Sequence, residues 1–457
     1  MYGRYKIPIQ DSSVSGERIA QSKLGSDPNF PLSPANNLRG VLSNSLRAAF
    51  VSTNSITQGE QVGVLWSWLL AQGIEIGFAH RTFKWSNEAS GKAAVHCVVI
   101  GFGYEWGGVK TIYEYADIAG EPVALAVSNI NPYLVDAPNV FLQKRSKPIC
   151  SVPPISRGSD ATDDGNLLLS SEERDQLIAQ EPQAEPRIKR FVMGNEFINS
   201  IDRWCLWLEG IAPKELRSLS LVNKRVAAVK LFREKSKREK TQQMADFPTS
   251  FGEPRQPKQS YLAIPKVSSE RRNFIPMDFL SADVIAGDKL FTMAEANLFH
   301  FGVLTSTMHM AWMRTTCGRL KSDYSYSNTI VYNNFPWPVA LLISDQKEPL
   351  AVIKSARSAI ESGAQAVLDA RAQFPGSSLA DLYDPLAMPP ALLKAHQKLD
   401  AAVDKAYELH GGDMKGKKSY KTDAERVAFL FELYQRLTSL LPAEKAKKSS
   451  KKQPSPA

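Results

Sequence analysis

A strand–helix–strand–strand pattern between residues 47 and 101 constrains the fold of this chain more than any other feature. Its last strand, Ala93–Gly101, is apolar at nearly every position, which is typical of a strand covered on both faces. The first strand has the same buried character and is expected to stop before Ser55. The three expected strands span residues 47–53, 74–79 and 93–101. This spacing predicts the closing part of an α/β sheet.

The helix of this pattern is expected to begin near Thr57, because Glu60 follows three residues later and can complete a capping box. Gly73 is expected to end the helix. Apolar residues recur between these points at helical spacing and predict the face that packs on the sheet. They are Val62, Leu65, Trp66, Leu69 and Leu70.

Composition and periodicity divide the chain into five regions. The first lacks long apolar periodicity and is rich in Ser, Asn and Pro, so it predicts a divergent or disordered segment. After the sheet region, short strands mixed with basic helices predict an α+β domain, and sustained helical periodicity then predicts a helical domain. Helices are expected at Ala351–Ala370, at Pro390–Leu409 and after Thr422, with Glu425 as its capping partner. The predicted boundaries are 1–46, 47–150, 151–340, 341–441 and, for a disordered basic tail, 442–457.

Basic residues outnumber acidic ones, with 56 Lys and Arg against 47 Asp and Glu and a formal net charge of +9. That balance suits a polyanion such as nucleic acid. Five lysines after Pro442 supply much of the excess. A second cluster has helical spacing and is equally compatible with nucleic-acid binding and with a solvated basic helix. Its members are Lys224, Arg225, Lys230, Arg233, Lys235, Lys237, Arg238 and Lys240.

Several features predict a cytoplasmic protein without a membrane partner. No apolar run approaches the roughly 20 residues of a membrane helix, and the N-terminus lacks the apolar core of a signal peptide. The four cysteines show no Cys-x-x-Cys spacing, so neither a metal site nor a disulfide framework is expected. Reduced thiols fit a cytoplasmic location.

Nine segments carry a family resemblance: Phe50–Gln61, Phe78–Trp85, Asn129–Leu134, Arg203–Leu208, Pro265–Arg272, Met308–Arg314, Gly318–Tyr324, Tyr332–Pro338 and Leu379–Asp384. In this order they resemble the C-terminal half of the MmeI-like enzymes. These are large fused type II restriction–modification proteins that combine a nuclease, a class I S-adenosylmethionine-dependent adenine methyltransferase and a target-recognition domain. The resemblance implies part of a methyltransferase sheet, then a target-recognition domain and a helical domain, with double-stranded DNA as the partner.

The resemblance also implies catalytic motifs that are not found here. The family has a glycine motif through which the backbone approaches S-adenosylmethionine, and an Asn-Pro-Pro-Phe/Tyr motif that holds the flipped adenine. Both should precede the strand at Phe50, as should the nuclease core, and none is found. Three imitations, Asp27–Phe30, Gly101–Gly103 and Asn131–Tyr133, lack the family's position. Binding of S-adenosylmethionine by this chain alone is therefore not expected.

By resemblance, residues after two of the strands border the pocket of the flipped base. Ser52 and Asn54 lie at the end of the first strand, and Phe83 and Trp85 follow the second. Such a position suits a ligand contact, because the carboxyl ends of strands face the ligand in an α/β sheet. The alternative is turn chemistry for Asn54 and simple packing on the sheet for the two aromatic residues.

Charged side chains are expected to read bases and hold phosphates. Arg can pair with guanine through two hydrogen bonds, Asp can accept from cytosine N4, and Lys reaches phosphates. A structural ion pair between Glu270 and one of the arginines is an equal alternative. His309 is expected in the core, and Tyr332–Pro338 as a rigid packing segment. The predicted DNA-binding residues are Arg81, Lys84, Arg271, Arg272, Arg314, Arg319, Lys321 and Asp323.

Three hypotheses about function follow. In the first, the chain is the DNA-binding, sequence-recognising portion of an N6-adenine DNA methyltransferase, truncated or split from its catalytic motifs. In the second, it is a DNA-specificity subunit that works with a separate methyltransferase or nuclease chain, which would dock on an exposed sheet edge. In the third, it is a non-functional remnant. Sequence-selective DNA binding that survives raised salt would exclude the third.

Overall fold

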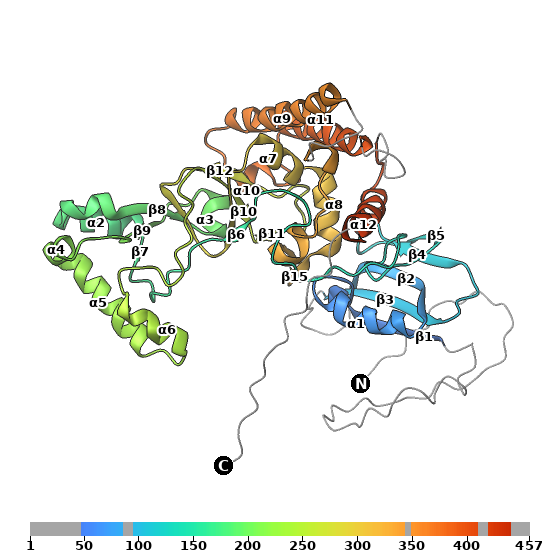
Figure 1. Cartoon of the computed structure of the whole chain (residues 1–457), viewed down its shortest axis with the longest axis horizontal. Coiled ribbons are helices and arrows are strands. Elements are labelled where there is room, and N and C mark those ends of the chain that lie inside the picture. The colour runs from blue at the N-terminus through green and yellow to red at the C-terminus, as the bar shows by residue number, and fades with distance from the viewer. Residues whose placement is uncertain (1–46, 86–94, 343–348, 410–418, 440–457) are drawn as a thin grey trace, which may run out of the picture. The chain divides into compact units, whose positions relative to one another are not determined.

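The structure, a computed structural model, describes residues 47–85, 95–342, 349–409 and 419–439 (Figure 1). These residues belong to one compact unit. The expected segments 1–46 and 442–457 lie outside the described residues, as does the side chain of Trp85. Among the helices that the structure describes, none combines the length and the apolarity needed to span a bilayer.

A five-stranded sheet forms the first part of the described chain, coloured blue to cyan in Figure 1. Its strands are β1 (Arg47–Thr53), β2 (Ile74–Trp85), β3 (Val95–Tyr104), β4 (Lys110–Glu114) and β5 (Val123–Val127), in the order β1-β3-β2-β4-β5. β3 is antiparallel to both of its neighbours, whereas β2 and β4 are parallel. The three strands expected from the sequence are therefore present, and β2 extends beyond its predicted end.

β1 lies at the edge of this sheet and is exposed, so the prediction of a buried first strand is wrong. Phe50 is 56% exposed and Val51 57%, and no described strand pairs with the outer side of β1. The helix α1 (Gln61–Ala71) also exposes apolar side chains, with Val64 at 80% and Trp68 at 64%. Apolar composition predicted the strand correctly but could not reveal that it lies at an edge.

The start of α1 differs from the prediction. Thr57 ends a short 3-10 turn (Asn54–Thr57), and its hydroxyl donates to the Asn54 carbonyl at 2.9 Å, so it does not cap the helix. Glu60 instead forms an ion pair with Lys144 at 2.9 Å. The predicted capping box is therefore wrong, and α1 begins at Gln61. The predicted end is correct, because Gly73 follows the helix with a φ of 84°.

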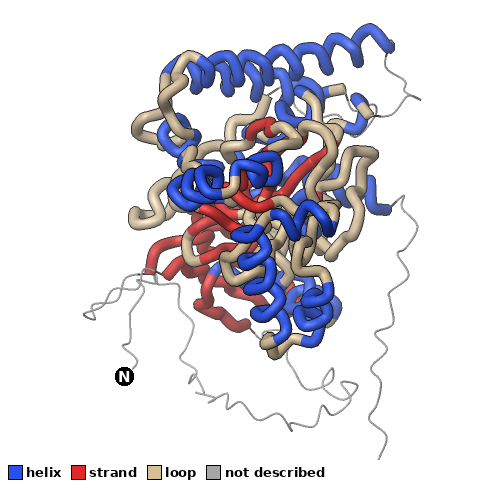
Figure 2. The backbone as a smooth tube through the Cα atoms, turned by 90° about the vertical axis from the view of Figure 1, so that its left-hand side faces the viewer, coloured by secondary structure: helices blue, strands red, loops and turns tan. Residues whose placement is uncertain are grey.

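Three small sheets follow in the middle of the chain, as expected for an α+β domain. Their orders are β12-β10-β14-β6, β13-β8-β9-β7 and β11-β16-β15. The strands are β6 (Ser156–Arg157), β7 (Leu168–Leu169), β8 (Ile188–Val192), β9 (Trp204–Leu206), β10 (Tyr261–Pro265), β11 (Val267–Ser268), β12 (Asp278–Leu280), β13 (Val284–Ala286), β14 (Leu290–Ala294), β15 (Gly318–Leu320) and β16 (Asp323–Ser325). Figure 2 shows the strands in red among helices and loops.

One part of this region, residues 161–258, is called the α5 lobe below. Most of its buried apolar residues form a small hydrophobic core that is distinct from the main core of the molecule. Its helices are α2 (Ser171–Gln180), α3 (Gly194–Asn199), α4 (Pro213–Ser218), α5 (Ser220–Glu234) and α6 (Glu239–Gln243). In Figure 1 it is the green part of the chain.

The C-terminal part is helical, and the predicted helices agree with those observed within two residues. Ala351–Ala370 lies within α9, and Pro390–Leu409 corresponds to α11. The hydroxyl of Thr422 accepts from the backbone N–H of Glu425 at 3.2 Å, as predicted for a helix start. The helices are α7 (Leu298–Leu304), α8 (Thr307–Thr316), α9 (Leu350–Ala372), α10 (Leu379–Leu382), α11 (Pro390–Glu408) and α12 (Asp423–Ser439).

Candidate nucleic-acid interface

The carboxyl ends of β1 and β2 face α8 and the β15–β16 hairpin across one cleft. The cleft consists of three adjoining hollows of about 300, 480 and 300 Å³, which share lining residues such as Ile118 and Arg319. Ends of strands that converge on a concave surface are the usual place for a ligand in α/β proteins. Among the predicted residues, those lining this cleft are Asn54, Arg81, Lys84, Arg271, Arg314, Arg319 and Lys321.

The β15–β16 hairpin places two of these residues in the cleft. Leu320 pairs with Asp323, which leaves Lys321 and Ser322 as a two-residue turn. Lys321 has a φ of 57°, a conformation that is uncommon for a residue other than glycine. Lys321 and Ser322 together line the hollow that Asn54 lines from the end of β1. The hairpin therefore presents an ammonium group opposite the sheet.

A shared carboxylate links the hairpin to the sheet. One oxygen of Glu270 lies 3.5 Å from a terminal nitrogen of Arg319 and 3.6 Å from Nδ1 of His96 on β3. Arg319 also donates to the Ser322 carbonyl at 2.7 Å and lies over the ring of Tyr324, 4.1 Å from its centroid. The alternative of an ion pair between Glu270 and an arginine thus has a geometric basis, and Arg319 is the arginine concerned.

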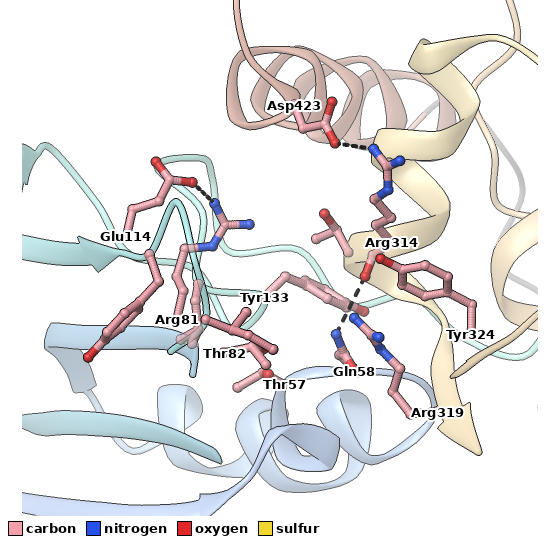
Figure 3. Close-up of a pocket in the computed structure, with 14 residues that line it drawn as sticks. Thr57, Gln58, Arg81, Thr82, Glu114, Tyr133, Arg314, Arg319, Tyr324 and Asp423 are labelled. Carbon is pink, nitrogen blue, oxygen red and sulfur yellow. Dashed lines mark hydrogen bonds and ion pairs between the residues drawn. The ribbon is translucent and has the colours of Figure 1, made fainter. Parts of the chain in front are cut away.

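Two further arginines stand on opposite sides of the cleft, each beside a carboxylate (Figure 3). Arg81 on β2 lies 2.6 Å from Glu114 on β4, and Arg314 on α8 lies 2.7 Å from Asp423 on α12. Arg314 also donates to the Asn273 carbonyl at 3.0 Å. These partners fix the direction of both guanidinium groups, while about a quarter of each side chain stays accessible.

Four residues that line the cleft carry buried polar atoms without a hydrogen-bond partner among the described residues. The atoms are Asn54 Nδ2, Gln58 Oε1, His96 Nδ1 and Arg319 Nε. Native proteins leave few buried polar atoms unsatisfied, because each such atom costs free energy. Donors and an acceptor grouped in this way can be satisfied by a polar ligand or by ordered water.

The other predicted residues lie elsewhere. Arg272 and Asp323 line a neighbouring hollow of about 370 Å³, where burial lowers the pKa of Arg272. Phe83 stacks on the ring of Tyr115 at 5.4 Å, in agreement with the packing alternative. Ser52 is half-buried on β1 and lines none of these hollows, and the side chain of Trp85 is outside the described residues.

Some lining residues carried no prediction of a binding role. His96 lies in an apolar strand, Tyr133 belonged only to a motif imitation, and Thr315 gave no local signal. Only an isolated polar residue in a continuous apolar strand, as at His96, could have drawn attention. His309, by contrast, lies in the core as expected. Its Nε2 lies 2.9 Å from the Tyr326 hydroxyl, and burial lowers its pKa to about 3.

Two of the motif imitations have structural explanations. The side-chain oxygen of Asn131 accepts from the backbone N–H groups of Tyr133 and Val135 at 3.0 and 3.1 Å, so this side chain builds a turn. A Cβ at Gly101 would come within 1.9 Å of the Phe78 ring, so this glycine makes room for packing. Asp27–Phe30 lies outside the described residues. Within the described ranges, no three His, Cys, Asp or Glu side chains gather as a metal site would require.

Three domain families match the chain in order. They are described as the MmeI DNA-methyltransferase domain at residues 36–114, the MmeI target recognition domain at 136–339 and the MmeI C-terminal domain at 352–442. The chain belongs to the MmeI family. This confirms the resemblance, together with the expected succession of a partial α/β sheet, an α+β region and a helical region.

Two relatives are similar to this chain over most of its length. DNA methyltransferase A of Bacillus subtilis (strain 168) is 38% identical over 392 residues, which are 86% of this chain and 42% of that protein. The solved structure of the type IIL restriction–modification enzyme MmeI in complex with DNA is 50% identical, with a TM-score of 0.75. That match covers 86% of this chain and 50% of the other. The chain thus spans about half the length of these relatives.

Proposed function

We propose that the described part of the chain forms the DNA-binding, sequence-recognising portion of an N6-adenine DNA methyltransferase of a restriction–modification system. The observation that carries the proposal is the set of four buried polar atoms around the cleft that make no hydrogen bond with the described residues, on Asn54, Gln58, Arg319 and His96, the last of which lies 3.6 Å from Glu270. A nucleobase presents donors and acceptors along its edge and can satisfy such atoms. The solved relative that is 50% identical was determined in complex with DNA, which supports the same partner here.

The groups around the cleft divide by what they can bind. Arg319 has a free Nε and a planar fork suited to the acceptor pair of a guanine. Two exposed lysines are placed to bind phosphates. They are Lys321 at the hairpin tip and Lys84 near the end of β2. Asn54 borders the hollow at the end of β1, where the flipped adenine would enter.

S-adenosylmethionine, which the methyltransferase family uses, has no fitting site among the described residues. A glycine-rich turn between a parallel strand and a helix would be needed for the backbone to approach the cofactor. Gly101 and Gly103 instead lie within β3, and Gly101 accommodates the Phe78 ring. In the proposal, the role of the described residues is to bind and recognise DNA.

Replacing Arg319 with Gln tests this function. We expect the wild-type chain to enrich one sequence from a random duplex pool and to retain it at raised salt. R319Q should lower affinity for that sequence by about 10- to 100-fold, the range of a bidentate arginine–guanine pair. Selection from the pool identifies the enriched sequence, and fluorescence anisotropy across a salt series then measures the affinity of each protein for it.

The control is R436Q, an exposed arginine about 20 Å along α12 from Asp423. This variant should bind like the wild type. A wild-type chain that enriches no sequence, with binding that collapses as salt rises, would refute the proposed function, because phosphate contacts alone behave in that way.

A second candidate is a specificity subunit that works with a separate methyltransferase chain, and the exposed edge of β1 favours it. Phe50 on β1 and Trp66 on α1 both pack against Phe102, so the edge and α1 share one face of the sheet. On that face Phe50 is 56% exposed, and Trp68 on the outer side of α1 is 64% exposed. Unpaired strand edges with apolar side chains readily accept a further strand.

Mixing experiments test the second candidate. We expect the N-terminal half of the Bacillus subtilis relative to form a one-to-one complex with this chain in sedimentation experiments. The double variant F50D/W68D should weaken the complex by at least about tenfold, because two apolar contacts become charged. L386D changes an 88% exposed leucine outside this face and serves as the matched control. Two chains that sediment separately at micromolar concentration would count against a separate partner.

A further inference from the structure

Most of the excess positive charge of the chain lies in one stretch of the α5 lobe. Residues 213–258 contain 12 Lys and Arg against five Asp and Glu, an excess of seven in a chain whose net charge is +9. The basic tail after Pro442 contributes less than this stretch. The cluster that the sequence left open between DNA binding and a solvated helix is therefore the main basic feature of the molecule.

The burial pattern of α5 separates a packing face from a basic face. Val222, Val226 and Val229 are buried in the small core of the lobe, one helical turn apart. Lys224 and Lys230 lie on the exposed side, and exposed basic residues continue after the helix at Lys235, Lys237 and Arg238. The packing of the helix thus directs these charges toward solvent.

These charges also lack close acidic partners. Lys224, Lys235, Lys237 and Arg238 form no ion pair with the described residues, and Lys230 is only loosely paired with Glu234 at 3.8 Å. The arginines of the cleft are different, because Arg81, Arg314 and Arg319 each lie beside a carboxylate. Unpaired ammonium groups can exchange condensed counterions on a polyanion for direct contacts at little cost.

Exposed apolar groups accompany this basic face. Leu231, on α5, is 50% exposed, and Phe247, in the turn after α6, is 68% exposed. The carbonyl of Phe247 accepts from Arg233 of α5 at 2.9 Å, which fixes this turn against the helix. A sugar–phosphate backbone offers apolar sugar faces between its charges, so it can cover both kinds of group.

We propose that the basic face formed by Lys224 and Lys230 of α5 with Lys235, Lys237 and Arg238 of the segment that follows is a second DNA contact that binds phosphates outside the recognition sequence. The inference rests on the proposed function and extends it. The cleft reads bases, whereas the basic face adds sequence-independent affinity and lengthens the stretch of duplex that is occupied.

Charge neutralisation tests the basic face. The variant K224Q/K230Q/K235Q/K237Q should enrich the same sequence as the wild type but bind long duplexes less tightly. The slope of log affinity against log salt should become shallower by about 0.9 for each phosphate that the variant no longer neutralises. On a duplex no longer than the enriched sequence, the variant and the wild type should bind alike.

The control makes the same charge change on the helical domain. K354Q/K394Q/K398Q/K405Q alters four exposed lysines of α9 and α11 and should leave the slope on long duplexes unchanged. An unchanged slope for the α5 variant, with the enriched sequence retained, would overturn this inference and leave the proposed function standing. A wild-type chain that enriches nothing would refute the proposed function instead. Matching thermal unfolding of all three proteins confirms that folding is not the cause.

Discussion

Replacement of Arg233 by alanine is expected to lower the free energy of unfolding by about 3–5 kcal/mol. This side chain is wholly buried and donates to five backbone carbonyls. The acceptors are Ala161 and Thr162 at 3.0 Å, Met244 at 3.0 Å, Phe247 at 2.9 Å and Ser250 at 2.8 Å. Removal leaves these carbonyls without a donor and leaves a cavity, and each buried unsatisfied group costs roughly 1–3 kcal/mol. Water entering the cavity would recover part of the loss.

Urea unfolding followed by tryptophan fluorescence measures this loss, since Trp204 and Trp207 lie in the α5 lobe. The control is R217A, an exposed arginine on α4 of the same lobe, which should change the free energy of unfolding by less than about 0.5 kcal/mol. R233K keeps the charge but has three donors, so an intermediate loss is expected. Equal stability of R233A and R217A would show that the five hydrogen bonds contribute nothing.

Arg233 also shows why periodicity alone could not assign the basic cluster. The sequence placed eight basic residues together between 224 and 240, but they do different things in the folded chain. Arg233 points into the lobe, and Arg225 pairs with Glu173 of α2 at 2.7 Å. Lys224 and Lys230 lie on the exposed face. Which basic residues face the core depends on partners distant in sequence, such as Ala161 and Glu173.

Long regular elements were predictable because their signal is local and repeated. The helix expected at Ala351–Ala370 is observed as Leu350–Ala372, so its ends were predicted within two residues. Its apolar stripe repeats over several turns. The start of α1 was mispredicted because the Thr57 hydroxyl could either accept from a backbone N–H as a helix cap or donate to a carbonyl, and it donates to the Asn54 carbonyl in a 3-10 turn. Such local competition cannot be resolved from residue types alone.

The cleft combines contacts that no local pattern contains. Gln58 donates to the carbonyl of Arg314, 256 residues away, at 3.4 Å. Glu270 meets Arg319 across 49 residues. The sequence supplied most of the lining residues through the family resemblance and the chemistry of Arg and Lys. Their grouping around one cavity, and the presence of His96 within it, required the fold.

Replacement of Glu270 by Gln is expected to raise affinity for random duplex DNA by about tenfold while reducing discrimination between sequences. Glu270 is the carboxylate that lies against both Arg319 and His96. A negative charge about 10 Å from phosphates costs roughly 1–2 kcal/mol at an effective dielectric constant near 20, and its removal gives the tenfold gain. Salt weakens this gain, so it should shrink as ionic strength rises.

Discrimination should fall because Glu270 makes the wrong sequence unfavourable. In the free chain this carboxylate partly neutralises Arg319, which must leave it to pair with a base. A guanine in the correct position replaces the lost contact with Glu270 by two hydrogen bonds to Arg319, whereas another base does not. Without the carboxylate, Arg319 is equally available to any sequence. We therefore expect the ratio of specific to random affinity to fall by about tenfold or more in E270Q.

A matched control and a double variant decide whether Glu270 affects discrimination through Arg319. E432Q makes the same charge change at an exposed site on α12 and should leave the affinity ratio unchanged. If Glu270 acts through Arg319, then E270Q should have little further effect on discrimination once R319Q is present. Additive effects of the two substitutions would mean that Glu270 contacts DNA by itself, and an unchanged ratio in E270Q would remove it from recognition altogether.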